Sequence, residues 1–160
     1  MHEPGRPLLP RLLALLVLCA SPALAAVGVD RFAGSHCHPS HFDGETSRWS
    51  YQGDRLLNRG TTDWDVLIAS CPIHAEPPAA TGNSRLDLVR VIVTGAEAES
   101  GWCTVTHAGT EYPMTPSPTN PELFTWRPPA YTGVMPREFT VACLLLRGQE
   151  LDQLELIWYW

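Results

Sequence analysis

The chain has 160 residues, of which 17 are acidic and 11 are basic, giving a net charge of −6 with neutral histidines. The 11 basic residues are all arginines, and the sequence contains no lysine. An acidic chain without a basic cluster is a poor binder of nucleic acid, so that class of partner is not expected. The length fits one domain with a substantial hydrophobic core. The use of arginine alone, with abundant alanine and proline, is typical of a GC-rich bacterial genome.

The first 26 residues have the three parts of a secretory signal peptide. Two arginines precede an apolar run at residues 12–19, and a proline then leads to the small residues 23–25. The run is too short to cross a bilayer as a helix, which takes about 20 apolar residues. We expect cleavage after Ala25 or Ala26 and no stable membrane span afterwards; an uncleaved anchor is the alternative. The mature domain, residues 27–160, is then periplasmic or secreted, with a net charge of −7.

Short runs of β-branched and aromatic residues follow, and no long segment has helical periodicity. Glycine, proline, asparagine or aspartate bounds each run, which is typical of all-β sandwiches. In chain order, the predicted strands are residues 46–52, 56–58, 64–71, 86–94, 102–107, 123–126, 138–146 and 154–160. We therefore predict an antiparallel β-sandwich, jelly-roll-like, of about seven to eight strands.

The run 86–94 is the strongest of these predicted strands. Its valines alternate with Leu88, Arg90 and Ile92, which predicts a central strand covered on both sides. The next run, 102–107, follows a glycine and is predicted to be the second strand of a hairpin.

Prolines mark where strands should end. Pro72 follows the apolar run 64–71 and, having no N–H, limits how far the ladder of this strand can continue. The segment 113–121 is rich in proline and is predicted to be a loop. In the run 138–146, the odd-numbered residues Phe139, Val141, Cys143 and Leu145 are predicted to share one face.

Four cysteines remain after the expected cleavage, while Cys19 belongs to the segment that is removed. An even number in an exported chain indicates a disulfide framework, and four cysteines allow three pairings. We favour Cys37 with Cys71 and Cys103 with Cys143, because each pair brackets a set of consecutive predicted strands. Chain entropy gives each such loop about 3.8 kcal/mol of stabilisation at most, so reduction should weaken the fold severely.

A combination of cysteines and strand residues carries a resemblance to a known group. The residues concerned are Cys37, Tyr51, residues 56–58, Cys71, Pro72 and Ile73, residues 91–93, Cys103, Phe139 and Cys143. Together they resemble a loose group of small bacterial exported proteins of unknown function, mainly through cysteine spacing. The resemblance implies a β-sandwich with sequential disulfides, and it carries over no activity and no catalytic residue. The histidine and tryptophan content of this chain departs from that group.

The densest group of potential metal ligands is His36, His38 and His41, with Cys37 between the first two. Imidazole and thiolate are favoured ligands of Zn²⁺ and Cu⁺. In an extended segment, His36 and His38 would project to one side and Cys37 to the other, which suits a disulfide flanked by solvent-facing histidines. Two interpretations follow: a surface cluster that binds metal only adventitiously, or a metal site of the cell envelope. No resident cofactor is expected.

Six tryptophans and four tyrosines form the second distinctive feature of the composition. They either fill the core, as most strand aromatics do, or form an exposed patch for a protein or glycan partner.

Motifs of the common catalytic sites do not occur in the chain: there is no nucleophile elbow, metalloprotease helix or phosphate loop. Asp63 and Asp65, or Glu97 and Glu99, could form a carboxylate pair, but solvated turn acids are the commoner case. We expect a non-enzymatic protein with a binding or structural role. The alternatives are a metal-binding envelope protein that uses the three histidines, and a carbohydrate-binding module.

Overall fold

The computed structural model describes residues 27–40, 48–62, 65–76, 85–95, 102–128 and 138–159. The expected signal peptide, its cleavage site and His41 lie outside these residues. Within them, no helix has the length and apolar character needed to cross a membrane.

The described residues form twelve strands and one 3₁₀ helix. Their bounds are β1 Val27–Ala33, η2 Gly34–His36, β2 His38–Ser40, β3 Trp49–Gln52, β4 Arg55–Asn58, β5 Leu67–His74, β6 Arg85–Thr94, β7 Trp102–His107, β8 Thr110–Pro113, β9 Thr115–Pro116, β10 Leu123–Trp126, β11 Glu138–Leu145 and β12 Glu150–Tyr159.

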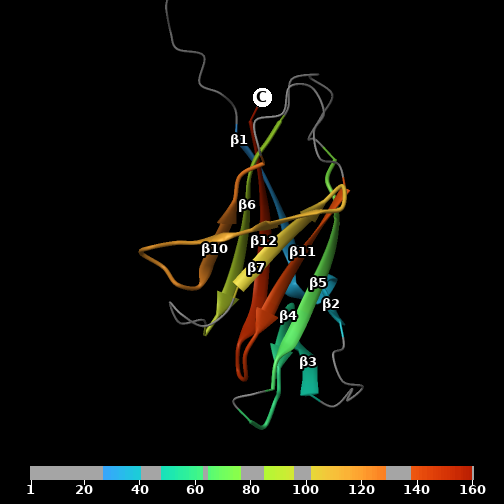
Figure 1. The fold of residues 1–160 in the computed structure, drawn as a ribbon, viewed down its shortest axis with the longest axis vertical. Helices are drawn as coiled ribbons and strands as arrows, with labels where there is room; N and C mark the ends of the chain where they lie inside the picture. Colours follow the sequence, from blue (N-terminus) through green and yellow to red (C-terminus); the bar gives the residue numbers. More distant parts are fainter. Residues whose placement is uncertain are drawn as a thin grey trace, which may run out of the picture.

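The strands form two antiparallel sheets packed face to face, which confirms the predicted β-sandwich (Figure 1). The seven-stranded sheet has the order β3-β4-β12-β6-β10-β9, and β1 also pairs with β12. The five-stranded sheet has the order β2-β5-β11-β7-β8. The central rows, β4-β12-β6-β10 and β5-β11-β7-β8, have the interlocked arrangement of a jelly roll, because most successive strands alternate between the sheets.

The core lies between the two sheets and is built by alternation along the strands. On β6, the three valines are at most 1% exposed, whereas Leu88, Arg90 and Ile92 on the opposite face are half-buried. This strand is central, as predicted, but the prediction that it is covered on both sides is wrong, because its outer-face residues remain partly exposed, as is usual in a two-layer sandwich. On β11, the odd-numbered residues share one face, as predicted, and this face is buried.

Two of the connections that pass from one sheet to the other are fixed by specific contacts. The chain leaves β1 through η2 to reach β2, and β8 continues through the buried Met114 to β9. The first crossing requires Gly34, since a Cβ atom there would lie 1.9 Å from the carbonyl oxygen of Leu151. The second is fixed by Met114, whose N–H donates to the carbonyl of Cys103 (2.8 Å).

The jelly-roll order corrects two further predictions. The predicted hairpin between 86–94 and 102–107 is wrong, because β6 and β7 belong to different sheets. The predicted loop at 113–121 contains β9, which pairs with β10. Strands β1, β2 and β8 were also not predicted from the sequence.

Pro72 lies inside β5 rather than at its end. On one side it is paired in register with Thr140 of β11. On the other side, β2 pairs only with Ile68, Ala69 and Ser70. The missing N–H of Pro72 therefore leaves no carbonyl of β2 without a hydrogen-bond donor.

Candidate functional site

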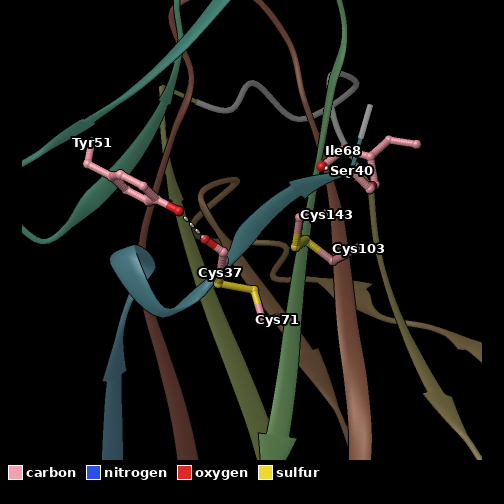
Figure 2. The surroundings of a disulfide bond; sticks show 7 residues. All are labelled: Cys37, Ser40, Tyr51, Ile68, Cys71, Cys103 and Cys143. Carbon is pink, nitrogen blue, oxygen red and sulfur yellow. Dashed lines mark hydrogen bonds between the residues drawn. A yellow bond between two sulfur atoms is a disulfide. The ribbon is translucent and has the colours of Figure 1, made fainter. Parts of the chain in front are cut away.

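Both disulfides lie on the core side of the five-stranded sheet (Figure 2). Cys37 and Cys71 connect the start of β2 to β5, and Cys103 and Cys143 connect β7 to β11. Their Cα–Cα distances are 4.2 Å and 4.1 Å, since each pair sits on directly adjacent antiparallel chains. This is the pairing favoured from the sequence, and all four cysteines are at most 2% exposed. The thiol of Cys37 is therefore not available as a metal ligand.

Tyr51 connects the seven-stranded sheet to the first disulfide. Its hydroxyl donates to the carbonyl oxygen of Cys37 at 2.9 Å, as Figure 2 shows. Its ring also meets Trp49 edge-on, with the ring centroids 5.3 Å apart. Although Tyr51 is 42% exposed, its polar end is used inside the protein, so this residue holds β3 against the turn before β2.

The histidine segment does not have the extended form expected from the sequence. His36 ends the 3₁₀ helix η2, which is closed by the N–H of Cys37 donating to Gly34 (3.0 Å), and His38 begins β2. Both histidines are exposed, as expected, and the ring of His36 contacts Phe32. Among the residues that the structure describes, no group of three or more His, Cys, Asp or Glu side chains could hold a metal ion.

A buried polar network joins the two sheets at one end of the sandwich. The amide nitrogen of Asn58 on β4 donates to the carbonyls of Asp65 (2.7 Å) and Leu145 (2.8 Å), and its amide oxygen accepts from the N–H of Gly60 (2.8 Å). Asn58 is 1% exposed, so every one of these bonds replaces water. The sequence analysis did not identify this network; an asparagine that ends an apolar strand before a glycine was its only local signal.

Asp65 belongs to the same network, and the prediction that it is a solvated turn acid is wrong. It is 7% exposed, its carboxylate accepts from the N–H groups of Thr61 (2.7 Å) and Thr62 (2.8 Å), and it pairs with Arg48. These contacts lower the pKa of Asp65, mainly through the N–H of Thr62, and burial opposes them in part. Asp63 lies outside the described residues. The carboxylate of Asp65 thus closes a turn and does not form a catalytic pair.

The outer face of the five-stranded sheet takes no part in these buried networks. Register aligns Trp102, Leu144 and Ile68 in one row across three strands, which we call the apolar row. Next to it lies a row of Thr104, Ala142 and Ser70, followed by a row of Thr106, Thr140 and Pro72. We call these nine residues together the neutral face. Trp102 is 50% exposed at one corner of it.

The outer face of the seven-stranded sheet has the opposite character. Glu155 on β12 pairs with Arg31 (3.1 Å) and Arg90 (3.7 Å) from the two neighbouring strands. Arg55 pairs with Glu150 (3.1 Å) and Asp152 (2.9 Å), and these contacts raise the pKa of Arg55, chiefly through the hydrogen bond to Glu150. The charged side chains of this outer face thus form ion pairs across the strands, as on an ordinary solvated surface.

The fold and its cross-links define an antiparallel β-sandwich of the jelly-roll type with two disulfides within one sheet. No protein-family model matches the chain, and no curated protein sequence matches it significantly. Two disulfides are typical of proteins that fold in an oxidising environment. The class of protein therefore rests on the fold, and any function must be argued from the residues themselves.

Proposed function

We propose that this chain is exported and acts in the periplasm or outside the cell as a non-enzymatic module that binds a partner through the neutral face. Export is supported by the signal-peptide pattern of the first 26 residues and by the two disulfides. The metal-binding alternative uses His36, His38 and His41; His41 lies outside the described residues, and among those residues no group of three metal ligands is present.

The observation that carries the proposal is the contrast between the two outer faces. The seven-stranded sheet presents paired charges to solvent, whereas the neutral face presents a half-exposed tryptophan beside Leu144 and Ile68, which are half-buried. An exposed tryptophan beside aliphatic residues costs solubility unless it serves contact with another molecule, and such patches mark interaction sites. The neutral face is therefore the better candidate for binding.

A non-enzymatic role fits the side chains of this face. Its nine residues are hydroxyl-bearing, aliphatic or aromatic, and none of them ionises near neutral pH. General acid–base catalysis needs a side chain with a pKa near the working pH. The nearest ionisable residues on the outer side of the sheet are His38, in register with Ser70, and Glu111, in register with Thr106; both are exposed. They lie on the two edge strands β2 and β8, four strand spacings of about 4.8 Å apart, so they cannot act together as an acid–base pair. The chemistry of the face supports contact rather than turnover.

The test is retention of the oxidised protein by the envelope fraction and by the extracellular polymers of the source cells. Trp102→Ser and Ala142→Arg change the neutral face, and Val29→Ser and Val29→Arg are matched controls, since Val29 is 44% exposed on the other sheet. We expect about tenfold weaker retention for each neutral-face variant and no change for the controls, because a buried aromatic contact contributes more than about 1 kcal/mol. Equal retention of all four variants, each shown to be folded by circular dichroism, would contradict the proposal.

Export itself is tested by the mass of the protein recovered from an oxidising compartment. We expect the mass of a chain that begins at Ala26 or Val27, less four hydrogen atoms for the two disulfides. A full-length mass with free thiols would contradict export.

A further inference from the structure

We infer that the partner of the neutral face is an uncharged glycan chain, with Trp102 stacked on a sugar ring and the neighbouring hydroxyl side chains bonded to the sugar hydroxyls. This inference rests on the proposed function and specifies the chemistry of its ligand. Three properties of the described residues carry it: the distribution of charge, the arrangement of apolar and hydroxyl rows, and the composition of the surface.

Charge is distributed unevenly between the two sheets. None of the five strands of the smaller sheet contains an arginine, and the chain has no lysine at all. The seven-stranded sheet, in contrast, carries Arg31, Arg55, Arg85 and Arg90. A sulfated or carboxylated polysaccharide, a phosphate polymer or an anionic membrane would need cations on the face that binds it. The neutral face is flanked by His38 on β2 and Glu111 on β8 but carries no arginine or lysine, so it is complementary to a ligand without charge.

The rows of the neutral face match the two kinds of surface that a sugar ring has. Adjacent strands lie about 4.8 Å apart, so the apolar row extends about 10 Å from Trp102 to Ile68. A planar indole and aliphatic side chains suit the C–H faces of sugar rings, as they suit other flat apolar surfaces. The row beside it carries the hydroxyls of Thr104 and Ser70, and the next row those of Thr106 and Thr140.

Thr104 is buried, at 8% exposed, but the other hydroxyl groups of these rows are available to a ligand. Within the part of the chain that the structure describes, the side-chain oxygens of Ser70, Thr106 and Thr140 make no hydrogen bond to the protein, in contrast to Ser40, whose hydroxyl donates to Ile68 (3.2 Å). A hydroxyl can both donate and accept, as the hydroxyl of a sugar can. A glycan lying along the apolar row would therefore find bonding partners beside it.

The composition of the surface favours a glycan over a protein partner. Protein interfaces are depleted in serine and alanine, and their energetically dominant residues rarely include serine, threonine, leucine or valine. Around Trp102, the neutral face consists mostly of such residues, and it contains no arginine or tyrosine. It therefore lacks the usual features of a protein-binding surface apart from the single tryptophan.

The test measures binding to three portions of the envelope fraction, two of which are treated so that either proteins or sugars are destroyed. One portion is digested with protease, a second is treated with periodate, which cleaves the vicinal diols of sugars, and a third is left untreated. We expect the oxidised protein to bind the untreated and protease-digested portions equally and to bind the periodate-treated portion at least tenfold more weakly. We also expect Trp102→Phe to keep part of the binding and Trp102→Ser to lose it, while the Val29→Ser control binds like the wild type.

Each outcome has a separate meaning. Binding that resists periodate but is lost after protease digestion would overturn the glycan inference, yet the proposed function would stand, with a protein as partner. Binding that survives both treatments would point to a lipid and would also overturn it. If the wild type binds no portion, or if neutral-face variants bind as the wild type does, the proposed function fails as well. To separate loss of contact from unfolding, Thr106→Val and Thr140→Val are measured too, since they remove only the hydroxyls; we expect about threefold weaker binding for each.

Discussion

Cys103 and Cys143 lie directly opposite each other on β7 and β11, with their Cα atoms 4.1 Å apart. The first disulfide, between Cys37 and Cys71, joins the start of β2 to β5, and β5 lies next to β11. Four neighbouring strands of the five-stranded sheet are thus cross-linked in two pairs, and only the junction between β5 and β11 depends on hydrogen bonds and packing alone. The covalent links hold the strands that carry the neutral face.

Removal of the second disulfide should lower the free energy of unfolding by about 3 kcal/mol, because its loop spans 40 residues and closing such a loop restricts the unfolded chain. The measurement is urea unfolding of the double variant Cys103→Ala with Cys143→Ala, followed by tryptophan fluorescence. Thr106→Ala, an outward-facing change on the same strand, serves as the control and should cost little. A loss below about 1 kcal/mol in the double variant would show that the cross-link is not a main source of stability.

Trp158 should depend on Asp30 for its position in the core. The ring of Trp158 is fully buried, and its indole N–H donates to the carboxylate of Asp30 at 2.7 Å. Asp30→Ala leaves this donor without an acceptor, so we expect a loss of about 1–3 kcal/mol, and Asp30→Asn should lose less because its amide oxygen still accepts. Glu111→Ala, at an exposed acid, is the control. Equal stability of the Ala and Asn variants in urea unfolding would argue against this bond.

Asn58 should be among the most sensitive polar residues of the chain. Its replacement by alanine leaves the carbonyls of Asp65 and Leu145 and the N–H of Gly60 without their partner in a buried site. We expect a loss of about 3 kcal/mol or failure to fold. The matched control is Asn120→Ala, because Asn120 is exposed and accepts a single bond from the N–H of Glu122 (3.1 Å). Similar midpoints of thermal unfolding for the two variants would contradict the role of Asn58.

Acid should weaken the turn that Asp65 closes. Since its folded-state pKa lies below the ordinary value of 3.8, the ionised carboxylate stabilises the fold at any pH above that value, and this contribution is lost as the pH falls through the lowered pKa. The difference in unfolding free energy between wild type and Asp65→Asn should therefore be constant from pH 7 to about pH 5 and shrink below about pH 4. Urea unfolding at each pH measures it. A difference that stays constant down to pH 2 would show that the pKa of Asp65 does not change on folding.

Local pattern was sufficient for the long strands. Alternation of apolar and polar residues predicted β6 and β11, because one face of each is buried and the period of a strand is two residues. Strands β1, β2, β8 and β9 escaped prediction, since their pairing partners, and not their own residues, make them strands. Pro116 in β9 is an example: proline is disfavoured in strands, yet here it lies in a two-residue strand that pairs with β10.

For the candidate site, sequence reasoning found the individual residues but not their arrangement. The histidine cluster was conspicuous in the sequence, but in the structure His36 ends the 3₁₀ helix η2, whereas His38 belongs to strand β2. The neutral face was not visible, because its residues come from β5, β7 and β11, which lie far apart along the chain. Asp65 was misjudged for a different reason: its carboxylate accepts from the N–H groups of Thr61 and Thr62, which are close in the sequence, and this turn was not recognised.

The sequence by itself determined the all-β class and the presence of a disulfide framework, because strand period, turn residues and the number of cysteines are local or compositional properties. Only the tertiary structure decided which strands share a sheet, that β6 is covered on one face only, and that Trp102 aligns with Leu144 and Ile68. These features depend on the register between strands that are distant in the sequence, and register is fixed when two complete sheets bury their apolar faces against each other.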